Sequence, residues 1–183
     1  MKDIFDIKNI DKIERLENEH DLQKASLLER KLRLMGKENS ELRPIRNKLR
    51  NLIADYEDRK WSDFENIPDS KIEESNKAKE SIDSEQKFIK KRKEAIRKKL
   101  KEFDMTQQDL GVILEHPKSY MSELINGVSP FTIKDYVIIH RILGISLNTL
   151  IPTYLQAEST DRIKEAITKL NKPKLGSREK KLA

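Results

Sequence analysis

The sequence predicts an all-α protein in which an N-terminal helical hairpin precedes a bundle of shorter helices. Apolar residues recur at spacings of three and four along most of the chain, which is the period of a helix with one buried face. Threonine precedes two of these stripes, and glycine or proline follows them, as expected for helix caps and stops.

The N-terminal hairpin is expected to occupy residues 1–61. Its two helices are separated at Gly36, Asn39 and Ser40, and Pro44 is tolerated because it lies near the start of the second helix. Their apolar stripes consist of Ala25, Leu28, Leu32 and Met35, and then of Leu42, Ile45, Leu49, Leu52 and Tyr56. Two helices alone form too small a core, so we expect the stripes to be buried against a partner, a second copy of the chain, or the helices that follow.

An acidic polar linker is predicted for residues 62–85. This segment contains three basic and eight acidic residues together with Pro68. Such a composition buries little apolar surface, so part of the segment is expected to be mobile. The alternative is that residues 71–82 form a polar helix that continues into the basic segment behind it.

A basic helix is predicted to open a domain that spans residues 86–155. Nine basic and two acidic residues lie between positions 86 and 103, around apolar positions at helical spacing. Cations that neutralise DNA phosphates release counterions and bind without sequence preference. The alternative is a solvated helix face, so we expect only some of these side chains to touch DNA, and Lys98 and Lys99 are the candidates.

Two short helices joined by a tight turn are predicted within residues 105–127. Thr106 is the expected N-cap of the first, and Pro117 prevents that helix from continuing. Gly111 lies in mid-helix, where glycine costs about 0.5 to 1 kcal/mol relative to alanine, so we expect two helices to cross closely there. Gly127 supplies the left-handed end of the second helix.

Two further helices are expected to complete this domain. Thr132 caps a helix predicted over residues 133–143, Gly144 ends it, and a last apolar turn precedes Pro152. The basic tail, residues 156–183, has one amphipathic stretch before its basic run. Dimerisation and phosphate contact are the functional options for this tail.

Residues 105–133 resemble the Cro/C1-type (XRE) helix-turn-helix, whose second helix reads DNA. The resemblance is carried by Thr106, Gln107, Leu110, Gly111 at the usual alanine position, Leu124, Asn126 and Gly127. The segment Pro130-Phe131-Thr132 before an apolar helix further resembles the antitoxins of the HigA type. These resemblances imply a five-helix XRE-type domain that binds double-stranded operator DNA.

The resemblance also implies which side chains contact DNA. Lys118, Ser119 and Glu123 match base-contacting positions of the family. Lysine donates to guanine, serine to several bases, and glutamate accepts from the cytosine amino group. For Glu123 the alternative is a surface acid that is solvated or paired with Lys118. The full set of DNA-binding candidates on the two short helices is Gln107, Lys118, Ser119, Tyr120, Ser122 and Glu123.

A toxin-binding region is implied for the hairpin. The stretch LRNLIADYEDRKW, residues 49–61, looks like the leucine-rich segment that precedes the DNA-binding domain of HigA-type antitoxins. In that family this region contacts the toxin, a small basic RelE/HigB-like endonuclease that cleaves messenger RNA on the ribosome. The corresponding candidates are Leu28, Leu32, Leu49, Leu52, Ile53 and Tyr56. The alternative is a hairpin that serves only dimerisation.

No residue pattern supports an enzyme, and no cofactor is expected. The chain has no cysteine, and His20, His116 and His140 are isolated in the sequence rather than at metal-ligand spacing. Nucleophile motifs and phosphate-binding glycine loops do not occur. No apolar run is long enough to cross a bilayer and no signal-peptide core is present, so a cytoplasmic protein is expected.

These patterns together predict a cytoplasmic antitoxin of a type II toxin-antitoxin system. It would neutralise its toxin through the hairpin and repress its own promoter as a homodimer. The net charge of +6 agrees with a DNA-binding protein. The alternative is a free-standing XRE-type repressor of a phage or mobile element, and a protein adaptor that has lost DNA binding is the third possibility.

Overall fold

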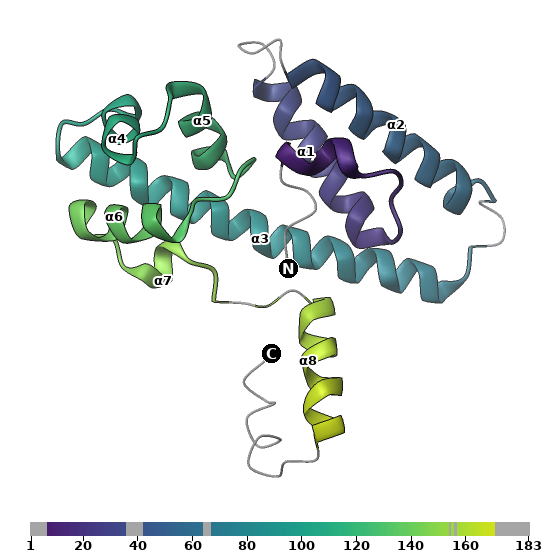
Figure 1. The fold of residues 1–183 in the computed structure, drawn as a ribbon. Coiled ribbons are helices and arrows are strands. Elements are labelled where there is room, and N and C mark those ends of the chain that lie inside the picture. Colours follow the sequence, from purple (N-terminus) through teal and green to yellow (C-terminus); the bar gives the residue numbers. More distant parts are fainter. Residues whose placement is uncertain (1–6, 36–41, 64–66, 154, 156, 171–183) are drawn as a thin grey trace.

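The computed structural model describes residues 7–35, 42–63, 67–153, 155 and 157–170, and it is helical without a strand in these ranges (Figure 1). This confirms the all-α prediction. The elements are η1 (Ile7–Lys12), α1 (Glu19–Met35), α2 (Leu42–Trp61), α3 (Asp69–Glu102), α4 (Gln107–Leu114), α5 (Lys118–Asn126), α6 (Ile133–Leu143), α7 (Leu147–Leu150) and α8 (Ala157–Leu170). The predicted hairpin break at residues 36–40 and the basic run after Leu170 lie outside the described residues.

Helix α3 runs along the molecule, with α1 and α2 packed at one end and α4 to α7 at the other (Figure 1). It has 34 residues and is therefore about 51 Å long. No glycine or proline interrupts it, which allows one continuous helix. Its buried residues recur at helical spacing and are Ala78, Ile82, Arg92, Ile96 and Leu100.

The linker prediction is wrong from Asp69 onward, because residues 69–85 belong to α3. The physical reason is that this polar segment still presents Ala78 and Ile82 on one face, and α3 packs against α1. The sequence left open whether residues 71–82 are a mobile linker or a polar helix that continues into the basic segment, and the structure has the helix.

The N-terminal half has a core of its own, built from η1, α1 and α2 against α3. Ile10, Leu16, Leu32 and Leu49 have no exposed area in it. The apolar stripes predicted to need a partner are thus buried within the chain. Val128, which follows α5, also belongs to this core, so the two halves of the molecule are in direct contact.

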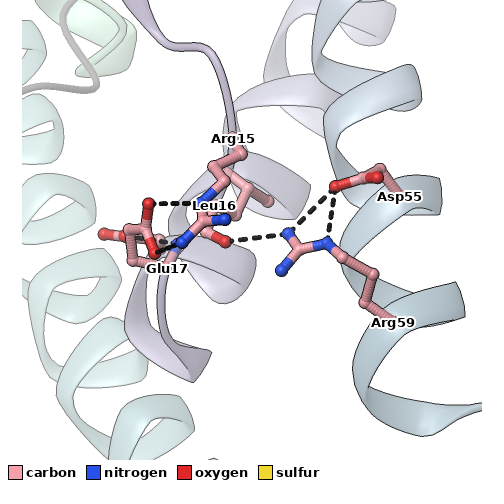
Figure 2. Close-up of polar contacts among 6 residues, drawn as sticks. Arg15, Leu16, Glu17, Asp55 and Arg59 are labelled. Carbon is pink, nitrogen blue, oxygen red and sulfur yellow. Dashed lines mark hydrogen bonds and ion pairs between the residues drawn. The ribbon is translucent and has the colours of Figure 1, made fainter.

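Polar contacts hold the loop before α1 against α2 (Figure 2). The Arg59 guanidinium donates to the carbonyl of Leu16 at 3.1 Å and pairs with Asp55 at 2.9 Å. Within the loop, Arg15 pairs with Glu17 at 2.7 Å. Exposed pairs contribute little free energy, so the buried side chain of Leu16 supplies most of the stability of this contact, and Arg59 orients the loop against α2.

The second core lies between the C-terminal half of α3 and helices α4 to α7, and its fully buried members are Ile96, Leu110, Met121, Leu124, Ile139 and Leu150. Thr106 and Thr132 are the N-caps of α4 and α6, as the sequence predicts, and each also forms a capping box with the aspartate three residues later. Gly127 and Gly144 end α5 and α6 in the left-handed conformation, at φ 66° and 65°.

The end of α5 is where the N-terminal half meets the second core. The Lys31 ammonium of α1 donates to the carbonyl of Gly127 at 3.0 Å. Lys93 of α3 donates to the side-chain oxygen of Asn126 at 2.6 Å. A Cβ added to Gly127 would lie 2.8 Å from Ile89. Both α1 and α3 therefore hold the C-terminus of α5 in place.

Substituting the two left-handed glycines tests this contact, with one serving as the control for the other. Both Gly127→Ala and Gly144→Ala place alanine in the left-handed region, which costs about 1 to 2 kcal/mol. Only Gly127→Ala also drives a methyl group into Ile89, because nothing lies within 4 Å at Gly144. We expect urea unfolding to show an additional loss of about 1 to 3 kcal/mol for Gly127→Ala. Equal losses, or additivity with Ile89→Ala in a double-mutant cycle, would contradict the contact.

Lys31 predicts a pH dependence of stability. Burial lowers the pKa of its ammonium to about 8 against the opposing influence of Glu85, while the unfolded chain keeps the ordinary value of 10.5. Between about pH 8 and 10.5 the unfolded state binds more protons, so the folded state gains stability as pH rises. We expect the wild-type chain to gain stability relative to Lys31→Met across this window in urea unfolding. Lys79→Met, at an exposed position of α3, is the control for the loss of a lysine side chain, and a pH-independent difference for Lys31→Met would refute the effect.

Candidate nucleic-acid interface

Helices α4 and α5 approach each other most closely at Gly111. A Cβ at this position would lie 2.9 Å from Cγ of Met121 and 3.0 Å from the carbonyl oxygen of His116. Any larger residue would therefore force the two helices apart. The close crossing predicted from a glycine in mid-helix is confirmed.

The turn between α4 and α5 consists of residues 115–117. Glu115 adopts the left-handed conformation at φ 60°, and the amide of His116 donates to the carbonyl of Gly111 at 2.8 Å. Pro117 then precedes the first residue of α5. The sequence placed the stop at His116 and Pro117, whereas the chain already reverses at Glu115, a residue type with no marked preference for that conformation.

The imidazole of His116 anchors this turn to α6. Its Nε2 lies 3.1 Å from a carboxylate oxygen of Asp135, which is buried and also accepts from the amide of Thr132. The ring of Tyr120 meets the imidazole edge-on at 5.1 Å. His116 is far from the other histidines in the sequence, and its partner in the structure is a carboxylate of α6. His140 also has a partner, since its Nδ1 lies 2.7 Å from the carbonyl oxygen of Ile145.

Helix α5 has one buried face and an exposed first turn. Met121, Leu124 and Ile125 are buried against the second core. Lys118 and Ser119 are exposed, and they are the first two residues of the helix. No side chain caps this end of α5, so the first backbone amides and both exposed side chains supply hydrogen-bond donors within one turn of the helix.

The remaining candidates on the two short helices are half-buried. The carbonyl of Ser122 accepts from the Asn126 amide at 2.8 Å, and the carboxylate of Glu123 accepts from the Ser129 hydroxyl at 3.0 Å. Glu123 is thus tied to the segment after α5 rather than to Lys118. Gln107 is the first residue of α4, on the N-terminal side of the same unit.

The basic run on α3 divides into structural and exposed residues. The Arg92 guanidinium is 5% exposed, donates to the hydroxyl of Tyr136 at 2.8 Å and lies 5.2 Å from the ring centre of Phe131. Lys99 pairs with Glu102, and Lys98 is exposed on the side of α3 opposite Ile96. The exposed cations of this run are Lys87, Lys90, Lys91, Arg97, Lys98 and Lys101.

The candidate toxin contacts lie in the first core. Leu28, Leu32, Leu49, Leu52 and Tyr56 are between 0% and 7% exposed, and Ile53 is half-buried. They are brought together by the packing of α1 on α2. A partner that meets the folded chain reaches the outer surfaces of these helices rather than these five side chains.

The described part of the chain contains no helix that could span a membrane and no cluster of three or more histidine, aspartate or glutamate side chains arranged to hold a metal ion. Comparison of the chain with protein-family models, with curated proteins and with solved structures returns no match.

Proposed function

We propose that the chain is a DNA-binding regulator in which α4, the turn and α5 form a helix-turn-helix of the Cro/C1 type. In this proposal the C-terminal half of α3 and helices α4 to α7 make up an XRE-type domain. One observation carries it. Helix α5 is short, crosses α4 at a position where a side chain does not fit, and presents an exposed lysine and serine at its N-terminus.

The arrangement of donors on α5 suits reading of the major groove. In helix-turn-helix proteins the N-terminal residues of the second helix reach the base edges. Lys118 donates to guanine O6 and N7, and the hydroxyl of Ser119 pairs with several bases. The tie between Glu123 and Ser129 gives this carboxylate a partner within the chain, so the first turn of α5 is the stronger candidate for base contact.

Operator binding is proposed to occur as a homodimer. Two copies place their α5 helices in successive major grooves, roughly 34 Å apart along the duplex. The exposed cations of α3 add attraction to phosphates that does not depend on sequence. Repression of the chain's own promoter follows if the operator overlaps it.

We further propose that the chain is the antitoxin of a type II toxin-antitoxin system, and that its N-terminal half binds a small basic RelE/HigB-like endonuclease. This rests on the resemblance to HigA-type antitoxins and on the core that η1, α1 and α2 form in the N-terminal half. A free-standing XRE-type repressor is the second candidate. The observation that favours it is the burial of the predicted toxin-contacting side chains within the chain itself.

Sequence reading and general attraction can be separated by two double variants. Lys118→Ala with Ser119→Ala removes the proposed hydrogen bonds to bases, so we expect binding of the chain's own upstream DNA to fall toward that of random duplex, by about 1 to 3 kcal/mol for each base that is no longer read. Lys98→Ala with Lys99→Ala should weaken all duplexes alike and flatten the salt dependence. Fluorescence anisotropy at several salt concentrations measures both. The same loss on every sequence for both variants would refute the assignment of α5.

The antitoxin proposal is tested by growth. Co-expression of the full chain with a small basic toxin encoded beside its gene should restore growth. Lys118→Ala with Ser119→Ala should restore growth equally well, because these two residues lie in the first turn of α5 and not in the N-terminal half that is proposed to bind the toxin. The comparison uses the full chain because deleting residues 1–61 would expose the face of α3 that carries Ala78 and Ile82. If the Lys118→Ala, Ser119→Ala variant failed to restore growth, or if no such toxin gene lay beside the gene for this chain, the free-standing repressor would be favoured.

A further inference from the structure

A pocket of about 640 Å³ opens between the start of α1, the end of α2 and the first third of α3. Its volume lies within the range of sites that hold a ligand or a large side chain. Carboxylates dominate its polar lining, and no described lysine or arginine lines it. The side chains that the following argument uses are Glu19, Glu57, Asp58 and Trp61.

Glu19 is the buried member of this set, at 1% exposure. Its Oε1 accepts from the hydroxyl of Tyr56 and from Nε1 of Trp61, both at 2.9 Å. Burial and this hydrogen bond raise the pKa of Tyr56, so the hydroxyl remains a donor to Glu19. The second oxygen, Oε2, is buried and has no hydrogen-bond partner within the described part of the chain. A buried acceptor without a donor is unusual in folded proteins and marks a position where a donor is missing.

The indole of Trp61 shows what kind of group this region accepts. The ammonium of Lys71 lies 4.3 Å from the centre of its ring, which is a cation–π distance. Glu57 and Asp58 are exposed on the last turns of α2, beside the indole. An aromatic face, a buried carboxylate and two exposed carboxylates together form surroundings that favour a cation.

The charge of this pocket is opposite to that of the chain as a whole. The protein carries a net charge of +6, and the DNA backbone would be repelled by the three carboxylates of the pocket. A partner that binds here is therefore different from DNA and can be bound at the same time. The guanidinium of arginine suits the site best, because it is planar, has five donors and stacks on aromatic rings.

We propose that this pocket binds an arginine side chain from a basic protein partner, with the guanidinium stacked on Trp61 and paired with the exposed carboxylates Glu57 and Asp58, while the buried carboxylate of Glu19 holds the indole in place and adds negative charge beneath it. The proposal deepens the proposed function by naming the chemistry with which the N-terminal half holds its partner. It rests on that function only for the identity of the partner as a toxin.

Trp61 is the only tryptophan of the chain, so its fluorescence and its indole N–H resonance report on this pocket without a label. The full chain is titrated with Nα-acetyl-arginine methylamide, and with the corresponding citrulline amide as the uncharged isostere. We expect a saturable change in both signals with arginine and none with citrulline. Glu57→Gln with Asp58→Asn should weaken arginine binding about tenfold, which corresponds to about 1.4 kcal/mol. Glu73→Gln, an exposed acid of α3 outside the pocket, is the matched control and should have no effect.

Lys71→Met is expected to strengthen arginine binding, in contrast to Glu57→Gln with Asp58→Asn. Lys71 is outside the lining, but its ammonium lies over the ring of Trp61. Removing this ammonium takes a positive charge away from the edge of the pocket and frees one face of the indole, so arginine binding should tighten several-fold. A purely structural role for these residues would leave arginine binding absent in every variant. Urea unfolding of each variant establishes that it is folded before the titration is interpreted.

Several results would overturn the proposal. They are equal responses to arginine and citrulline, arginine binding that Glu57→Gln with Asp58→Asn leaves unchanged, and a Trp61 response to spermidine at far lower concentration than to arginine, which would assign the pocket to a free polyamine. DNA binding measured on the same Glu57→Gln, Asp58→Asn protein should equal that of wild type. The pocket and the DNA-binding function can therefore fail independently of each other.

Discussion

The continuity of α3 is the constraint on which the rest of the structure depends. One face of this helix carries Ala78 and Ile82 toward α1, and the same face carries Ile96 and Leu100 into the second core. The second core contains Ile96 and Leu100 of this helix, and the first core packs against it through α1. Since a helix without glycine or proline bends little, the shared face also sets the orientation of α5 relative to the N-terminal half. Two small cores are thereby joined into a single structural unit rather than two domains on a mobile tether.

A second connection bypasses α3. Val128 enters the first core directly behind α5, and the carbonyl of Gly127 accepts from the ammonium of Lys31 on α1. The proposed DNA-reading helix therefore ends on residues that belong to the N-terminal half. A partner that displaces α1 relative to α3 would have to break or carry along this contact. The structure thus provides a direct physical route between the two ends of the molecule, without any change in the second core.

Local chemistry made much of this fold predictable from sequence. The threonine that caps the start of α4, Thr106, and the glycine that ends α5, Gly127, each act within one helical turn of their own position. Both were predicted correctly from the sequence. Features that depend on residues far away in the sequence were not predicted. The partner of His116 is on α6, and the helical state of residues 69–85 depends on packing against α1. The pocket around Glu19 needs three helices to form, and sequence spacing alone gives no signal for it.

The role of individual charged residues also depends on the fold and does not follow from the local composition of the sequence. The sequence concentrates cations before the two short helices, yet Arg92 is enclosed by aromatic rings and Lys93 binds Asn126. These two cations stabilise the attachment of α5 and α6 to α3 instead of facing solvent. The acidic pocket, in contrast, lies in a segment whose positive and negative charges nearly balance. A net charge therefore indicates the class of partner that the whole molecule attracts, while the partner of each surface follows from which charges the fold leaves exposed.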